Sequence, residues 1–146
     1  MRHLALLLLL LHAPFALAAD WVRLKIRYSE DQYFYDRSKL VADNHEMTYW
    51  KKVLFKTPRP VKTQLASSAL MRERIDCREH TLRLLSFLYY DAQGTVIEYV
   101  AEAEKEAAPI IPETVGDRFE QVLCTAAKRP NDHMIIIDQD DDQARL

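Results

Sequence analysis

The side chains best suited to catalysis are few and widely separated in this sequence. Beyond the first residues the histidines are His45, His80 and His133, which fall in two predicted turns and in the C-terminal tail. A nucleophilic hydrolase would need one of these bases beside a serine or cysteine. No GxSxG, HExxH or glycine-rich phosphate loop occurs, and the only glycines are Gly94 and Gly116. We therefore expect no catalytic residues and no bound cofactor.

The two cysteines, Cys77 and Cys124, have two readings, a disulfide or a metal site. Zinc sites use four ligands, and neither cysteine lies in a CxxC motif or near a suitably spaced histidine. The acidic run Asp138 to Asp142 lacks the glycine and the closing glutamate of a calcium loop. The pattern favours a Cys77–Cys124 disulfide and no metal site.

A basic segment is the best candidate for a contact surface. Between residues 51 and 74 one acid, Glu73, stands against seven cations. A strand that alternates apolar and charged residues exposes its charged side chains on the solvent face of the sheet. An ordinary solvated sheet face is therefore the competing interpretation. The candidate ligand surface comprises Lys51, Lys52, Lys56, Arg59, Lys62, Arg72 and Arg74.

The first residues have the order of a secretory signal peptide. Arg2 precedes the apolar run Leu4 to Leu11, and small residues follow at Ala16 and Ala18. This run is too short for a membrane-spanning helix, which needs about 20 apolar residues. We expect residues 1–18 to be removed, leaving a periplasmic or secreted chain without a transmembrane segment. No cysteine lies at the cleavage point, so we expect no lipid anchor.

Export determines the expected oxidation state of the cysteines and the size and charge of the mature chain. Thiols are oxidised in the periplasm and outside the cell, which supports the disulfide. Removing residues 1–18 leaves 128 residues with 19 basic and 22 acidic side chains, enough for one domain. Its net charge is therefore about −3, which gives no reason to expect nucleic-acid binding.

The first part of the mature chain predicts three strands. Residues 21–28 alternate between apolar and basic side chains, and 33–35 is a short aromatic run that we expect to pair with them as a hairpin. Residues 46–55 are rich in β-branched and aromatic side chains and predict a third strand. We expect Pro58 and Pro60 to interrupt it, because proline cannot donate to a sheet ladder.

The middle of the chain is ambiguous. Intrinsic propensity favours a helix over 63–79, but the charged residues there leave no clean helical stripe. Residues 80–90 fit a long strand buried on both faces. Residues 91–94 predict a hairpin turn with Gly94 at a position needing positive φ, and 95–100 return as the partner strand.

The last part of the mature chain predicts one helix followed by a tail. Apolar side chains recur at three- and four-residue steps from Val115 to Ala126, with Thr114 as N-cap and Asp117 in the first turn. Cys124 would lie on this helix. Residues 129–146 contain the acidic run, whose like charges repel, and we expect this tail to be disordered.

Several of these features, in this order, resemble the surface-adhesin protein E domain family of Gram-negative bacteria. The resemblance covers about residues 21–124. It rests on Trp21 with its alternating strand, Tyr35-Asp36 followed by Ser38 to Val41, Asp76-Cys77, Leu84-Leu85-Ser86, Tyr90-Asp91, and Pro112 with the helix carrying Cys124.

The resemblance implies an α+β domain over residues 21–128. Its antiparallel sheet of about six strands would be tied to one C-terminal helix by the Cys77–Cys124 bridge, and the stretch before Cys77 would be strand rather than helix. It also implies a non-catalytic binding protein for a host-matrix or envelope protein, with homodimerisation as a further expectation. The alternative is an accessory structural protein of the envelope without a host ligand.

Overall fold

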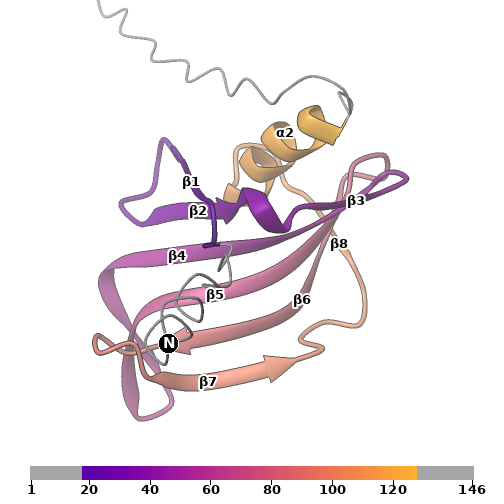
Figure 1. Cartoon of the computed structure of the whole chain (residues 1–146). Coiled ribbons are helices and arrows are strands. Elements are labelled where there is room, and N and C mark those ends of the chain that lie inside the picture. The colour runs from indigo at the N-terminus through magenta and orange to yellow at the C-terminus, as the bar shows by residue number, and fades with distance from the viewer. Residues whose placement is uncertain (1–17, 128–146) are drawn as a thin grey trace, which may run out of the picture.

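The computed structural model describes residues 18–127 and contains an antiparallel sheet with one α-helix (Figure 1). The expected signal peptide and acidic tail lie outside this range, apart from Ala18. The elements are β1 (Trp21–Leu24), β2 (Gln32–Asp36), the 3-10 turn η2 (Arg37–Lys39), β3 (Val41–Asp43), β4 (Glu46–Val61), β5 (Gln64–Asp76), β6 (Thr81–Tyr90), β7 (Val96–Ala101), β8 (Ala108–Pro109) and α2 (Val115–Ala127).

The sheet has eight strands, so the expected number of about six is too low. Six strands form the main path in the order β1-β2-β4-β5-β6-β7, while β3 pairs with β4 and β8 pairs with β6. The two additional strands contain three and two residues. A strand is recognised in a sequence by alternating apolar and polar residues over about four residues or more, so strands this short could not be predicted. The expected antiparallel sheet with one C-terminal helix is confirmed.

The first hairpin forms as predicted, but its first strand is shorter than the alternation suggests. β1 pairs with β2 in the register Val22 to Tyr35 and Leu24 to Tyr33. The strand ends at Leu24, and Tyr28 is 81% exposed. The alternation predicted that Tyr28 lies on the buried face of the strand, and this prediction is wrong.

Strand β4 spans both prolines that were expected to interrupt it. Its register with β5 shifts between Leu54 and Arg59, so Pro58 lies in an irregular stretch without a ladder partner. β2 borders β4 only as far as Leu54, which leaves the outer part of β4 at an edge of the sheet. Prolines are tolerated at bulges and edges, where no ladder hydrogen bond is lost.

The ambiguous stretch before Cys77 is a strand, as the resemblance implied. β5 pairs along its length with β4 on one side and lies against β6 on the other. These two ladders outweigh the modest helical preference of its alanine, leucine and arginine residues.

The second hairpin also forms as predicted. Asp91 Oδ1 accepts hydrogen bonds from the backbone N–H groups of Gln93 (2.9 Å) and Thr95 (2.8 Å), and Gly94 has φ +81°. Every residue of β6 is half-buried, however, whereas full burial on both faces was expected.

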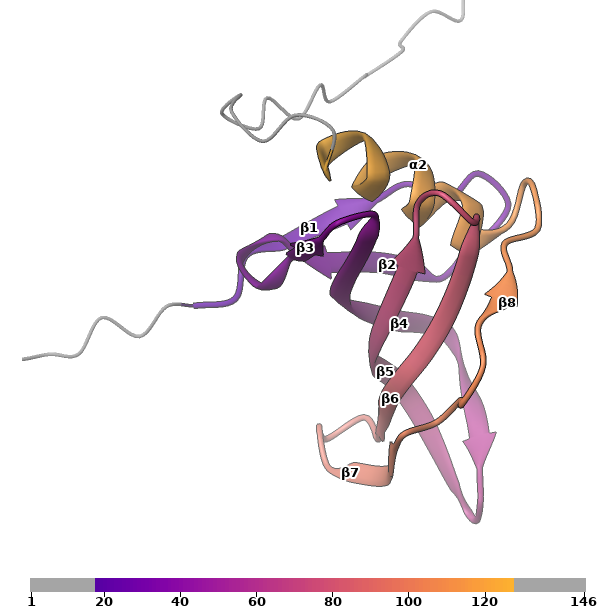
Figure 2. The ribbon, with the colours of Figure 1, turned by 90° about the vertical axis from the view of Figure 1, so that its right-hand side faces the viewer.

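Helix α2 packs on one face of the sheet, which we call the helix face. Its fully buried Phe119 stacks on Tyr49 of β4 with ring centroids 5.3 Å apart. Thr114 caps the helix, accepting from Asp117 N at 3.3 Å. Figure 2 shows α2 at one end of the sheet, with the β4–β5 hairpin extending toward the other end. The residues of this core are Leu24, Tyr33, Tyr35, Met47, Tyr49, Val53, Ile75, Phe119 and Leu123.

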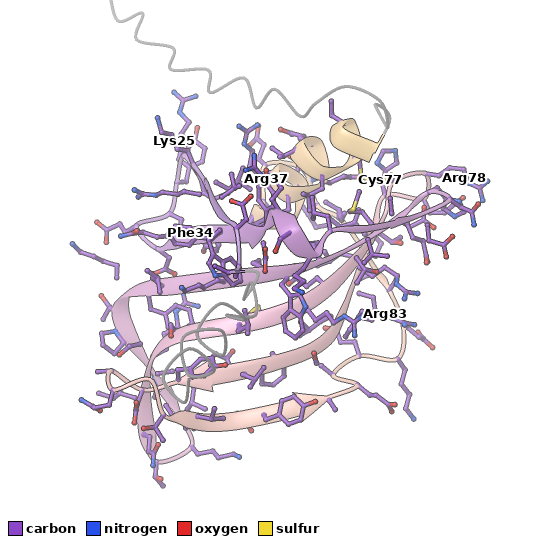
Figure 3. The ribbon with its side chains drawn as sticks, viewed as in Figure 1. Lys25, Phe34, Arg37, Cys77, Arg78 and Arg83 are labelled. Carbon is purple, nitrogen blue, oxygen red and sulfur yellow. A yellow bond between two sulfur atoms is a disulfide. The ribbon has the colours of Figure 1, made fainter. Side chains whose placement is uncertain are left out.

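The predicted disulfide joins Cys77 and Cys124, with their Cα atoms 5.6 Å apart. Cys77 directly follows β5, and Cys124 lies in α2. The bridge therefore fixes the C-terminal half of the helix to the end of the sheet, where Cys77 is labelled in Figure 3. A hydrogen-bonded pair, His80 Nδ1 and Glu120 Oε1 at 2.6 Å, links the β5–β6 turn to the same helix.

Candidate functional site

The seven cations of the predicted ligand surface do not form one patch. Side chains alternate between the two faces of a strand, so neighbours such as Lys51 and Lys52 point in opposite directions. The structure divides the seven into three groups: Lys51 on the helix face, a distal group on the outer part of β4 and its turn, and a third group on the face opposite the helix.

Lys51 belongs to the core under the helix. Its side chain is 12% exposed, forms an ion pair with Glu73 and lies 5.6 Å from the ring centroid of Phe119. Glu73 also accepts a hydrogen bond of 2.5 Å from the hydroxyl of Tyr49. Burial, followed by the neighbouring Glu73 charge, raises the pKa of Tyr49 well above its ordinary value. These groups satisfy one another in the interior, so Lys51 is not available to a ligand.

Two of the three distal cations are neutralised locally. Arg59 forms an ion pair with Asp31 and lies 4.3 Å from the ring centroid of Phe55. Lys62 at the turn forms an ion pair of 3.1 Å with Glu98 of β7. Lys56 is exposed and lines, with Arg59, a shallow hollow of about 350 Å³ beside the β1–β2 connection. Because Arg59 is paired with Asp31, the hollow does not present a cluster of unpaired cations.

Lys52, Arg72 and Arg74 lie on the face opposite the helix, which we call the open face. Strand pairing sets their neighbours in rows across the sheet, because paired residues project on the same side. The open face consists of the row Arg23, Phe34, Lys52, Leu70, Leu88 and Tyr99, the row Trp50, Arg72, Ser86 and Ala101, the row Thr48, Arg74 and Arg83, and Trp21.

Nothing in residues 18–127 forms a second layer on the open face. α2 packs on the other side, and all eight strands lie within the sheet. Open-face residues in the middle of the sheet, such as Trp50 and Leu70, are therefore only half-buried. On the helix face Tyr49 and Val53 are 0% and 3% exposed. Figure 3 labels Phe34 on β2 and Arg83 on β6, which lie far apart on the sheet.

Positive charge on the open face is only partly compensated. Lys52 Nζ lies 5.2 Å from the ring centroid of Trp21, and neither Lys52 nor Arg72 has a carboxylate partner among residues 18–127. Arg74 does have partners, since it pairs with Glu46 (3.2 Å) and donates to Thr48.

Arg83 was not among the predicted site residues, yet it carries the strongest sign of a function. It stands directly opposite Arg74 on the neighbouring strand. Its Nε–H is buried without an acceptor in the part of the chain that the structure describes. Like charges placed opposite each other destabilise a sheet, and an unsatisfied buried donor adds to that cost. Only the cross-strand register brings Arg83 to this surface.

The described histidines lie at turns, as expected. His45 Nε2 is 3.1 Å from Asp76 Oδ2 and precedes β4, while His80 pairs with Glu120 at the β5–β6 turn. His133 lies outside the described range. Within residues 18–127 no group of three or more potential metal ligands comes together. No described helix is long and apolar enough to cross a membrane.

A family model described as surface-adhesin protein E matches residues 21–125. The chain belongs to the surface-adhesin protein E family. It is thus a surface-adhesin-like protein, and the match includes the open face and both cysteines.

Solved structures of Haemophilus influenzae protein E have the same fold. One crystal form shares 18% sequence identity with a TM-score of 0.55, covering 74% of this chain and 89% of that one. A selenomethionine form shares 17% identity with a TM-score of 0.52, covering 72% and 85%. A comparison with curated proteins finds no significant match. At these identities the structures support the fold alone.

Proposed function

We propose that this chain is an exported, non-catalytic binding protein that holds a protein ligand on the open face. The ligand, a host-matrix or envelope component, would present carboxylates beside apolar side chains. The observation that carries this proposal is the group of Lys52, Arg72 and Arg83, which have no carboxylate partner among the described residues and lie beside half-buried tryptophan and leucine.

Binding surfaces favour this combination of residues. Tryptophan, tyrosine and arginine supply most of the binding energy at protein interfaces, and apolar neighbours exclude water from their contacts. The pairing of Arg74 with Arg83 weakens the isolated sheet, and a partner carboxylate would relieve it. A residue that breaks a local rule of stability is expected at a functional site.

Two further features support export. The leader sequence in residues 1–18 and the oxidised pair Cys77–Cys124 both fit a compartment outside the cytoplasm. We propose a mature protein with a folded domain over residues 21–128 and an acidic tail over 129–146. Cell fractionation with thiol counting would test this, since a cytoplasmic product with free thiols would contradict it.

Binding can be tested with charge-reversed variants. We expect wild-type protein to capture a ligand from either an envelope extract or a panel of host matrix proteins, and R72E/R83E to lose that ligand. R37E/R78E is the matched control, because it reverses two arginines off the open face that pair locally with Asp20 and Glu79. Equal capture by R72E/R83E, with the fold intact, would contradict the proposal.

The source of the ligand decides between two roles. Capture only from the envelope extract would favour an accessory structural protein, and capture of a matrix protein would favour an adhesin. Homodimerisation stays a separate prediction, to be checked by sedimentation of the purified protein.

A further inference from the structure

The open face and the C-terminal tail have complementary chemistry. Lys52, Arg72 and Arg83 lack carboxylate partners within residues 18–127. Four aspartates follow the apolar run Met134 to Ile137, at positions 138, 140, 141 and 142. We propose that residues 134–142 dock on the open face of the same molecule and occupy it until a ligand displaces them.

The tail carries apolar and acidic side chains that complement the two kinds of group on the open face. Its apolar residues come first and its carboxylates directly after. On the sheet, the half-buried Leu70 and Leu88 are paired, and one step of two residues along β5 leads to Arg72 and Ser86. From the Cys77 end of the sheet Arg74 and Arg72 come before Leu70, so a tail that covers the leucines with Met134 to Ile137 must turn back along the sheet to bring its aspartates to the arginines. Opposite charges placed together in this way also relieve repulsion within the acidic run.

The starting point of the tail allows this contact. The disulfide holds Cys124 to Cys77. Cys77 comes three residues after Arg74 and five residues after Arg72. At about 3.3 Å per strand residue these arginines lie roughly 10 and 17 Å from Cys77. Ten residues lie between Ala127 and Asp138, and the eleven residue-to-residue steps span up to about 36 Å. The acidic run can therefore pass the end of the sheet and reach the open face. Figure 1 shows α2 close to that end.

Attachment to the domain favours the molecule's own tail over competitors. A covalently linked segment acts at an effective concentration on the order of millimolar, far above a second copy at micromolar concentration. Contacts between exposed charges weaken as salt screens them, so the docked state should be sensitive to ionic strength. This inference rests on the proposed function for its role as autoinhibition, but its test requires no ligand.

The test uses carbodiimide, which couples a lysine amine to a carboxylate that touches it. We expect the complete chain to give a monomeric product in which Lys52 is joined to a tail aspartate, identified by mass spectrometry. The variant K52R keeps the charge and should lose that product. D138N/D140N/D141N/D142N should lose it too, whereas aspartate-to-glutamate changes at the same four positions should retain it.

The two tryptophans provide an independent readout. Trp21 and Trp50, the only tryptophans, both lie on the open face. We expect the asparagine variant, or 0.5 M salt, to red-shift their emission and increase quenching by acrylamide, and the glutamate variant to behave as wild type. Absence of the Lys52 product, products joined only between molecules, or unchanged emission in the asparagine variant would each overturn the inference. Ligand capture could still fail or succeed independently of these results.

Discussion

Replacing Arg83 with glutamate should stabilise the protein while weakening its binding. Arg83 faces Arg74 across the β5–β6 ladder, and its Nε–H has no acceptor among the described residues. In the R83E variant a carboxylate faces Arg74 instead. The change removes a repulsive pair, creates an attractive one and eliminates the unsatisfied donor.

The magnitude follows from the cross-strand geometry. An opposite-charge pair across a sheet contributes roughly 0.2–1 kcal/mol, and a like-charge pair costs a similar amount. Arg74 already pairs with Glu46, which reduces the gain. We expect a net stabilisation of about 1 kcal/mol, which corresponds to a rise in Tm of about 4 °C for a domain of this size.

Urea unfolding and thermal melts of wild type, R83E, R74A and R74A/R83E would measure this effect. The cross-strand pair with Arg74 supplies part of the gain, so R83E should stabilise the wild-type background more than the R74A background. R78E, at an exposed turn, controls for the change in net charge. A loss of stability in R83E, or an equal gain in both backgrounds, would refute the reasoning. Unchanged capture of the ligand by R83E would refute the functional part.

Three further predictions concern the helix face. Removing the disulfide in C77S/C124S should destabilise the domain by about 4 kcal/mol, because the bridge spans 47 residues, and reductant should lower the melting temperature of wild type but not of the variant. E73Q should cost on the order of 3 kcal/mol in urea unfolding by leaving Lys51 unpaired in the interior, and K51M/E73Q should recover part of it; equal losses would contradict the pairing. The free energy of unfolding should fall as pH rises above about 10, because the Tyr49 hydroxyl ionises there in the unfolded chain while its raised pKa keeps it protonated in the folded protein. Y49F should flatten this pH dependence, and an unchanged pH dependence in Y49F would contradict the explanation.

Much of the fold was predictable because its signals are local. The Asp91–Gly94 turn, the helix from Val115 and the Cys77–Cys124 pair each depend on a few residues close together or on composition. Residues 64–76 were different, since their local preference is helical and only the resemblance indicated a strand. Two ladder partners, far away in sequence, decide that conformation.

The candidate site was harder to predict because it depends on register. The sequence marked a basic segment as the candidate surface but joined Lys51 to Lys52, which the two-residue period of a strand places on opposite faces. It also omitted Arg83, which reaches the surface only through its pairing with Arg74. Before the strand pairing is known, nothing in the sequence around Arg83 distinguishes it from an ordinary solvated arginine.

The most direct test of the open face as the binding surface is site-specific photo-crosslinking. A photoreactive phenylalanine analogue would replace Leu88 or Phe34 on the open face, and Tyr28 or Ile111 away from it. After incubation with the captured ligand and illumination, we expect a crosslinked product from positions 88 and 34 only. Crosslinks from positions 28 or 111, with none from the open face, would contradict the assignment of the ligand to this surface.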